Sequence, residues 1–172
     1  PSGRAEELAE ALAAELTARG EPPGSPRADL TDALDRVATS LADLDPGWGH
    51  RVGLLAQRLA ASRESLRPQA PAHGDLSPDQ VIRGDDDRLH LIDWDRWGWW
   101  PRGWDSATWT AQAVLDGAAT PGTCSPLLGE RPAPTVLAAA ALLRSPDPFR
   151  RLRHDWPAAT LRLLEHAEAV LG

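Results

Sequence analysis

The first part of the chain shows the apolar spacing of amphipathic helices. Leucines at every fourth position predict a helix over residues 4–19, and a stretch rich in proline and glycine follows it. Similar spacing predicts two further helices, over about 29–44 and about 49–66. Pro68 and Pro71 then interrupt the pattern. We therefore expect the chain to be helical up to these prolines.

The middle of the chain changes to a pattern typical of strands. Two short apolar pieces, at 81–82 and 89–92, are separated by the polar stretch 83–88, and this arrangement predicts a small β-hairpin with a polar turn. A loop rich in tryptophan follows the hairpin. The helical period then returns over 105–115.

The last third of the chain is again predicted to be helical. Residues 121–134 form a loop rich in proline and glycine, and helices are expected over 135–144, about 147–154 and 157–171, with prolines between them. No internal repeat is visible. The 172 residues therefore predict one mainly α-helical domain with a small β-hairpin.

Composition narrows the classes of protein to consider. The hydrophobic content of 42% indicates a globular protein, and the net charge of −7 argues against a nucleic-acid partner. The single cysteine, Cys124, excludes an internal disulfide and a zinc site with several cysteines. No apolar run is long enough to cross a membrane and no secretory signal is visible, so we expect a cytoplasmic protein without a membrane partner.

The residues with the clearest chemical pattern surround the predicted hairpin. His73 and Gly74 precede Asp75, an amide side chain follows at Gln80, and Asp93 ends the second apolar piece. Kinase catalytic lobes use a similar order, in which one aspartate orients the attacking hydroxyl while an amide and a second aspartate bind the metal.

The spacing of these groups suits phosphoryl transfer. A tight loop could direct Asp75 and Gln80 into one cavity, and Asp93 at the exit of the hairpin could face them. Mg²⁺ prefers oxygen ligands and commonly takes only one or two protein carboxylates, which Asp93 and the Gln80 carbonyl oxygen would satisfy. The alternative is an ordinary turn at Asp75 and a strand-end cap at Asp93. Either motif alone would be weak, but the two in this order are fairly specific.

Three motifs resemble the aminoglycoside phosphotransferase-like, or choline kinase-like, family. They are His73-Gly74-Asp75, Ile92-Asp93-Trp94 and Trp104-Asp105-Ser106-Ala107. The resemblance implies a protein kinase-like fold with ATP and Mg²⁺ as cofactors. It also implies that Asp75 is the catalytic base, that Asp93 and Gln80 bind the metal and the nucleotide, and that His73 and Asp105 are structural supports of the site.

The chain departs from the family pattern in two ways. Gln80 stands where the family usually has asparagine, so the amide oxygen is displaced by one methylene. The resemblance covers roughly residues 30–170, which correspond to the C-terminal lobe. Residues 1–70 contain no glycine-rich phosphate loop, and the whole chain contains no lysine. The N-lobe is therefore expected to be absent from this chain.

These observations predict one kinase-like C-terminal lobe over 1–172. Its expected parts are an N-terminal helix and loop (1–27) and a helical core (28–172), which carries a catalytic loop (73–80) and a metal-binding hairpin (81–95).

The function expected of such a lobe is ATP-dependent phosphorylation of a hydroxyl. The acceptor would be a small molecule or natural product, or a peptide, and a partner protein would supply the N-lobe. An alternative is a catalytically inactive, pseudokinase-like lobe that serves as a binding or scaffold module. The missing lysine favours this alternative, whereas the retained Asp75 and Asp93 oppose it. A fragment of a longer kinase is a third possibility.

Two further features invite a functional interpretation. The turn Asp85-Asp86-Asp87 could suggest a metal site, but an acidic hairpin turn is more often simply solvated. Six tryptophans lie within residues 94–109. Trp97, Trp99 and Trp100 are too close together for all of them to face inward, so we expect at least one to be exposed or covered by a partner. The other three are expected in the core: Trp94, Trp104 and Trp109.

Overall fold

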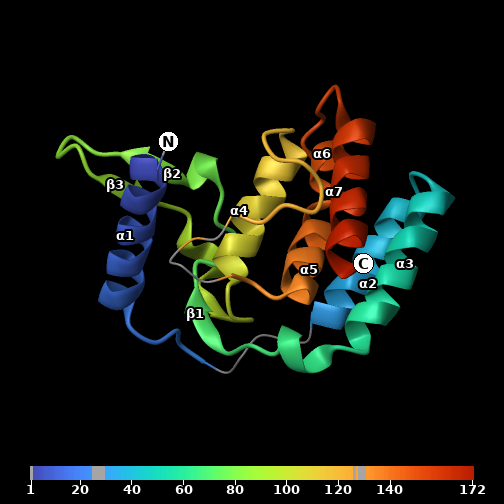
Figure 1. Cartoon of the computed structure of the whole chain (residues 1–172), viewed down its shortest axis with the longest axis horizontal. Coiled ribbons are helices and arrows are strands. Elements are labelled where there is room, and N and C mark those ends of the chain that lie inside the picture. The colour runs from blue at the N-terminus through green and yellow to red at the C-terminus, as the bar shows by residue number, and fades with distance from the viewer. Residues whose placement is uncertain (1, 25–29, 126, 128–130) are drawn as a thin grey trace.

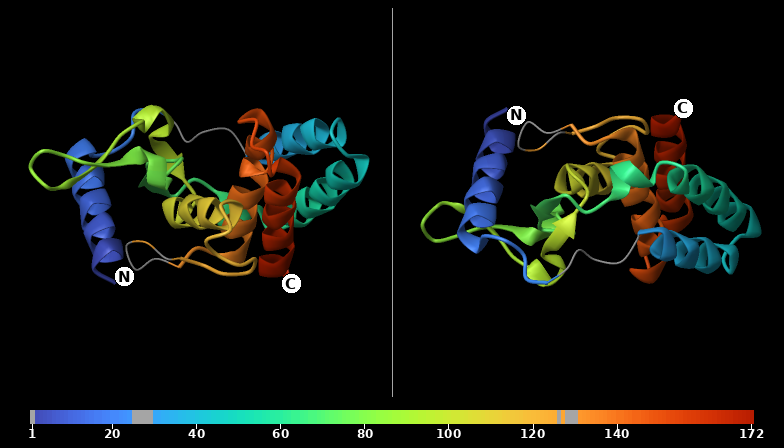
Figure 2. Two further views of the ribbon diagram at one scale, coloured as in Figure 1. Left: turned by 90° about the horizontal axis from the view of Figure 1, so that it is seen from above. Right: turned by 90° about the horizontal axis from the view of Figure 1, so that it is seen from below.

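Helices dominate the computed structural model of the chain. Seven α-helices lie in the part that the structure describes, which comprises residues 2–24, 30–125, 127 and 131–172. They are α1 (Ser2–Arg19), α2 (Leu30–Ala42), α3 (Pro46–Ala60), α4 (Trp104–Leu115), α5 (Pro134–Arg144), α6 (Asp147–Arg150) and α7 (Trp156–Leu171). Figures 1 and 2 show α1 at one end of the molecule, α2 and α3 at the other end, and α4, α5 and α7 between them.

The larger of two hydrophobic cores joins α2, α3, α4, α5 and α7. Leu41 of α2, Leu59 of α3, Val114 of α4, Leu142 of α5 and Leu163 of α7 are among its fully buried side chains. Several of the buried residues of α5 are alanines, which lets the neighbouring helices approach its backbone closely. Helices α4 and α5 of this core carry Asp105 and Arg144, two residues of the candidate site.

The smaller core holds α1 against a β-hairpin formed by β2 (Val81–Arg83) and β3 (Leu89–Leu91). Leu8 and Leu12 of α1 pack with Leu76 and Leu91 in this cluster. Arg83 of β2 also forms an ion pair with Glu7 of α1 at 3.0 Å. The first helix is therefore fastened to the hairpin by apolar contacts and by charge.

The hairpin confirms the pattern read from the sequence, with Val81 paired to Leu91. The expectation of only one such sheet is wrong, because β1 (Ala70–Ala72) pairs antiparallel with β4 (Gly98–Trp100), Ala70 lying opposite Trp100. Each of these strands has only three residues and the two are far apart along the chain. A local alternation of apolar and polar residues could therefore not predict their pairing.

Two helix boundaries also differ from those predicted. The third helix begins at Pro46, because the Asp45 side chain accepts a hydrogen bond from the Trp48 N–H at 3.1 Å and caps the helix. It ends at Ala60, and a separate 3₁₀ turn covers Arg63–Leu66. The helix predicted over 147–154 ends at Arg150.

None of Trp97, Trp99 and Trp100 is exposed, whereas the alternative, that a partner covers one of them, stays a prediction. Trp100 is buried and stacks on Trp104 with ring centroids 4.7 Å apart, and Trp97 and Trp99 are half-buried. Trp104 lies in the core as expected. The other two, Trp94 and Trp109, are half-buried against the smaller core.

None of the helices within the described residues has the length and apolar composition that crossing a bilayer requires.

We expect His166 of α7 to make the fold sensitive to acid. Its ring is fully buried, Nδ1 accepts the Gly122 N–H at 3.1 Å, and burial lowers the pKa of the imidazole. The unfolded chain binds a proton near pH 6.5 that the folded chain does not, so the free energy of unfolding should fall as the pH drops below about 6.5. The His166 contribution has a limiting slope of about 1.4 kcal/mol per pH unit.

Denaturant titrations at pH 7.5 and pH 5.5 would measure this effect. The wild-type protein should lose more stability between the two pH values than a His166→Gln variant. An equal loss in both proteins would contradict the prediction.

Candidate active site

The predicted catalytic loop runs from β1 to β2 and is tightly held at its start. Gly74 has φ +90°, a conformation that favours glycine, and an added Cβ would lie 2.5 Å from Trp100 Nε1. The Gly74 carbonyl accepts a hydrogen bond from Trp104 Nε1 at 3.0 Å. Only glycine therefore fits this position.

The side chain of Asp105, in the first turn of α4, binds the backbone of the same part of the loop. Its Oδ2 accepts the His73 N–H at 2.9 Å, and its Oδ1 accepts the Gly74 N–H at 3.0 Å. The residue is only 6% exposed, and this burial raises the pKa of its carboxyl group, while the two N–H donors act in the opposite direction. Asp105 thus lies where a structural support of the loop would be required.

His73 connects the loop to the segment that precedes Asp93. Its fully buried ring donates Nε2–H to the carbonyl of Ile92 at 2.9 Å and packs against Trp94, with centroids 4.6 Å apart. Its Nδ1 has no hydrogen-bond partner among the described residues. These contacts are consistent with the structural role that the motif implies for His73.

Asp75 follows this fixed segment and lines a cleft of about 960 Å³ between α2, the loop and α5–α6. Its side chain is 31% exposed. Oδ1 accepts a hydrogen bond from Arg144 Nη2 at 2.5 Å, and Oδ2 lies 3.5 Å from Arg96 Nε. Asp147 also lines the cleft, and burial raises the pKa of its carboxyl group. The carboxylate of Asp75 is thus accessible and held between two arginines.

Gln80 and Asp93 are brought together on another side of the loop. The Gln80 Nε2 donates to Asp93 Oδ2 at 3.5 Å, and the backbone carbonyl of Gln80 accepts the Ile92 N–H at 3.0 Å. Asp93 is exposed and has φ +60°. The cleft that contains Asp75 is lined by neither of them, so the structure does not place all three side chains in one cavity.

The Gln80 side chain offers an oxygen that nothing in the described chain uses. Gln80 is buried, and its Oε1 has no hydrogen-bond partner among these residues. In the structure the amide faces Asp93 with its NH₂ group, so turning the amide over would bring this oxygen to the carboxylate and give two oxygen ligands of the kind that a hard cation prefers. No group of three or more His, Cys, Asp or Glu side chains within the described ranges is arranged to hold a metal.

Arg144 is the site residue that the sequence did not reveal. It lies at the end of α5, is only 5% exposed, and contacts Gln112 Oε1 through Nη1 at 2.6 Å as well as Asp75. Gln112 in turn donates its amide to Asp116 at 2.7 Å. A charged residue after an almost wholly apolar helix is the only sequence signal that could have pointed to it.

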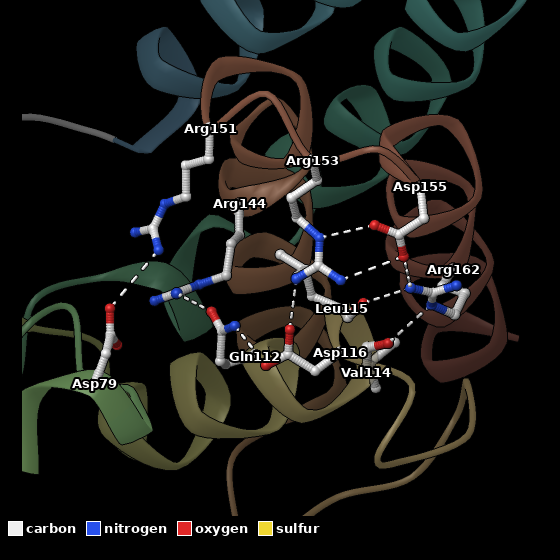
Figure 3. A network of polar contacts seen from close by, with 10 residues as sticks. All are labelled: Asp79, Gln112, Val114, Leu115, Asp116, Arg144, Arg151, Arg153, Asp155 and Arg162. Atoms are coloured by element: carbon white, nitrogen blue, oxygen red, sulfur yellow. Dashed lines mark hydrogen bonds and ion pairs between the residues drawn. The ribbon is translucent and has the colours of Figure 1, made fainter.

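The polar network continues from Asp116 to the last helix (Figure 3). Arg153 joins Asp116 at 2.6 Å to Asp155 at 3.0 Å, and Asp155 also pairs with Arg162 of α7 at 3.1 Å. Arg162 further donates to the carbonyl of Leu115 at 2.6 Å. The network therefore connects α4, the segment after α6 and α7.

An ion pair joins the loop to the segment after α6. Ser77 donates a hydrogen bond to Asp79, and this bond lowers the pKa of the Asp79 carboxyl group. Asp79 also lies 3.7 Å from Arg151, as Figure 3 shows. Both side chains of this pair are exposed, so the contribution of the pair to stability is small.

Comparison with known proteins gives one match. A family model described as "Phosphotransferase enzyme family" matches residues 1–122, which include α1, the loop, the hairpin and Asp105. The match thus takes in the first helix, which the motifs alone had not covered. No curated protein and no solved structure matches the chain.

Replacing Asp105 with asparagine should destabilise the fold. An asparagine can offer its oxygen to one of the two loop N–H groups, but its NH₂ would then face the other donor. Leaving one buried N–H unsatisfied costs about 1–3 kcal/mol. Denaturant unfolding of Asp105→Asn would measure the loss. Asp43→Asn, at an exposed position, is the matched control and should change the free energy of unfolding by less than about 0.5 kcal/mol. Equal effects of the two substitutions would contradict the anchoring role.

Proposed function

The chain belongs to the phosphotransferase enzyme family, and from that premise we propose that it forms the C-terminal lobe of an ATP-dependent kinase acting on a hydroxyl group. Family membership implies a protein kinase-like fold, and the described residues are mainly helical with two small sheets. The observation that carries the proposal is the position of Asp75. The loop before it is fixed by Asp105, and its carboxylate lines a cleft of about 960 Å³.

The proposed reaction is an in-line transfer of the γ-phosphoryl group of ATP. The acceptor oxygen forms a bond to the γ-phosphorus, and the bond from that phosphorus to the bridging oxygen breaks. ADP leaves with the electron pair of the broken bond. Asp75 orients the acceptor hydroxyl and accepts its proton, which then passes to solvent. The protein's contribution is mainly to position the groups and to neutralise charge.

Mg²⁺ is the proposed cofactor, and the residues that would hold it are Asp93 and Gln80. Once the Gln80 amide turns so that Oε1 rather than Nε2 faces Asp93, this oxygen and the exposed carboxylate of Asp93 suit a metal that prefers oxygen ligands. Mg²⁺ commonly takes only one or two protein carboxylates and completes its shell with phosphate oxygens and water. When bound, it would supply positive charge that neutralises the phosphates. In a chain without lysine, this charge could otherwise come only from arginine.

The acceptor is proposed to be a small molecule or natural product. A cleft of about 960 Å³ lies near the upper end of the volumes typical of small-ligand sites, about 300–1,000 Å³. A hydroxyl on a peptide is the other candidate acceptor. An N-lobe from outside this sequence, supplied by a partner protein or by the rest of a longer kinase, is proposed to complete the site, because a phosphate-binding lysine is absent from this sequence.

A second candidate function is a binding or scaffold lobe without catalysis. The lack of lysine supports it, and so does the engagement of Asp75 by two arginines. The two candidates differ in a measurable property, because only the kinase needs to bind Mg²⁺ with a nucleotide.

Calorimetry should show ATP binding that depends on Mg²⁺ and on Asp93. The Asp93→Ala substitution removes the proposed carboxylate ligand and should weaken binding at least about tenfold, the loss expected when a metal site loses a supporting contact. Asp85→Ala, in the exposed hairpin turn, makes the same change of charge and should bind like the wild type. Absence of Mg²⁺-dependent binding in the wild-type chain would count against the kinase and favour the scaffold.

The Asp75→Asn substitution should separate chemistry from binding. Loss of the base should lower the rate of ADP formation from Mg·ATP by about 10²–10⁴-fold, while nucleotide affinity stays the same because Asp93 and Gln80 are retained. The assay would compare water alone with a panel of small hydroxyl compounds as acceptors. An Asp75→Asn variant as active as the wild type would exclude Asp75 as the base.

A further inference from the structure

The buried guanidinium of Arg144 requires an explanation. Only 5% of the side chain is exposed, and removing a charge from water is costly unless the charge is paired and hydrogen-bonded. Arg144 has both kinds of partner, namely the carboxylate of Asp75 and the amide oxygen of Gln112. Its position is therefore determined by two contacts in different directions.

Gln112 is itself held so that its oxygen faces Arg144. Its Nε2 donates to Asp116 Oδ2 at 2.7 Å, which leaves Oε1 for the arginine. Asp116 is held in turn by Arg153 at 2.6 Å, as Figure 3 shows. Rotation of Gln112 or of the guanidinium would break at least one of these bonds. The arginine is thus fixed before any substrate arrives.

Asp75 has no comparable support from its own loop. The anchor at Asp105 holds the backbone of His73 and Gly74, but it does not touch the Asp75 side chain. The other ion-pair partner, Arg96, is 60% exposed and lies 3.5 Å away, so it restrains the carboxylate weakly. Arg144 is therefore the rigid group that sets the direction of the Asp75 carboxylate.

We propose that Arg144 is a positioning residue, which holds Asp75 by Oδ1 so that Oδ2 is the oxygen offered to the acceptor hydroxyl. The proposal rests on the proposed kinase function, in which Asp75 is the base. It places in the site a residue of α5, beyond residues 1–122 that the family model matches. A lysine would not replace Arg144, because one ammonium group lacks the planar fork that reaches Asp75 and Gln112 together.

The contact itself can be observed without any enzymatic assay. In NMR spectra of protein labelled with ¹⁵N-arginine at low temperature, the Nη groups of Arg144 should give resolved signals because they are buried and hydrogen-bonded. Asp75→Asn should shift these signals. Glu168→Gln, which removes the partner of Arg51 at 2.8 Å, should shift the Arg51 signals and leave those of Arg144 in place. Unchanged Arg144 signals in Asp75→Asn would overturn the proposal, whether or not the protein turns over ATP.

Kinetics then test the catalytic consequence, with Mg·ATP and water as the probe reaction. Arg144→Gln and Arg144→Lys should each lower the turnover number about 10²-fold, the effect of misplacing a reacting group by about 1 Å, with the KM for ATP unchanged. Arg51→Gln breaks an ion pair distant from the site and is the matched control. Added guanidinium ion should restore part of the activity of Arg144→Ala, because this shorter side chain vacates enough volume for the ion.

Three outcomes of these experiments decide whether Arg144 positions Asp75. A fall in turnover that only follows the loss of folded protein, or an equal fall in Arg51→Gln, would make Arg144 a stability residue and overturn the proposal. If Arg144→Gln does not fold, Arg144→Lys and the NMR comparison still decide. A wild-type protein without ATP turnover contradicts the proposed function instead, and the NMR result then shows independently whether Arg144 holds Asp75.

Discussion

The carboxylate of Asp105 is the group on which the rest of the candidate site depends. It lies in the first turn of α4, where the positive end of the helix dipole favours an acid, and it accepts the N–H groups of His73 and Gly74. The two bonds offset part of the cost of its burial. They also fix the loop backbone to a helix that belongs to the larger core. The backbone position of Asp75, the next residue, follows from this attachment.

After this fixed start, the polar side chains of the loop point to two different sides. Asp75 faces the cleft and the buried arginine of α5, whereas Gln80 turns toward Asp93 at the end of the hairpin. His73 joins the two sides, since its ring bonds to the carbonyl of Ile92, directly before Asp93. The proposed base and the proposed metal ligands therefore lie on different sides of one loop.

Much of this fold could be predicted from the sequence, because most of its elements are local. Leucine spacing identified α1 and α2, and the alternation of apolar and polar pieces identified the β2–β3 hairpin. The β1–β4 pair could not be predicted, because it depends on contacts between Ala70 and Trp100 that no local pattern reports. The start of α3 was predicted too late in the chain, although an aspartate followed by a proline, here Asp45 and Pro46, is typical of a helix N-terminus.

The site residues divide in the same way. Four site residues belong to short motifs or follow one at a fixed spacing, so the sequence alone identified them, while their roles in the site are proposals. They are Asp75, Gln80, Asp93 and Asp105. Arg144 could not, because its partner lies 69 residues away and a single sequence does not show that an arginine is buried. Aspartate adopts the left-handed conformation more often than most residues, but this preference alone does not predict it at Asp93.

The arginines of the network suggest how a chain without lysine organises this region. Arg144 reaches Asp75 and Gln112, Arg153 reaches Asp116 and Asp155, and Arg162 reaches Asp155 and a helix carbonyl. A lysine presents a single ammonium group, whereas the guanidinium fork can satisfy two partners in fixed directions. The composition that removes a phosphate-binding lysine therefore also permits a chain of double contacts across α4, α5 and α7. The rigidity of the Asp75 side chain depends on this series of arginine contacts, because Asp105 holds only the backbone of His73 and Gly74, the residues before it.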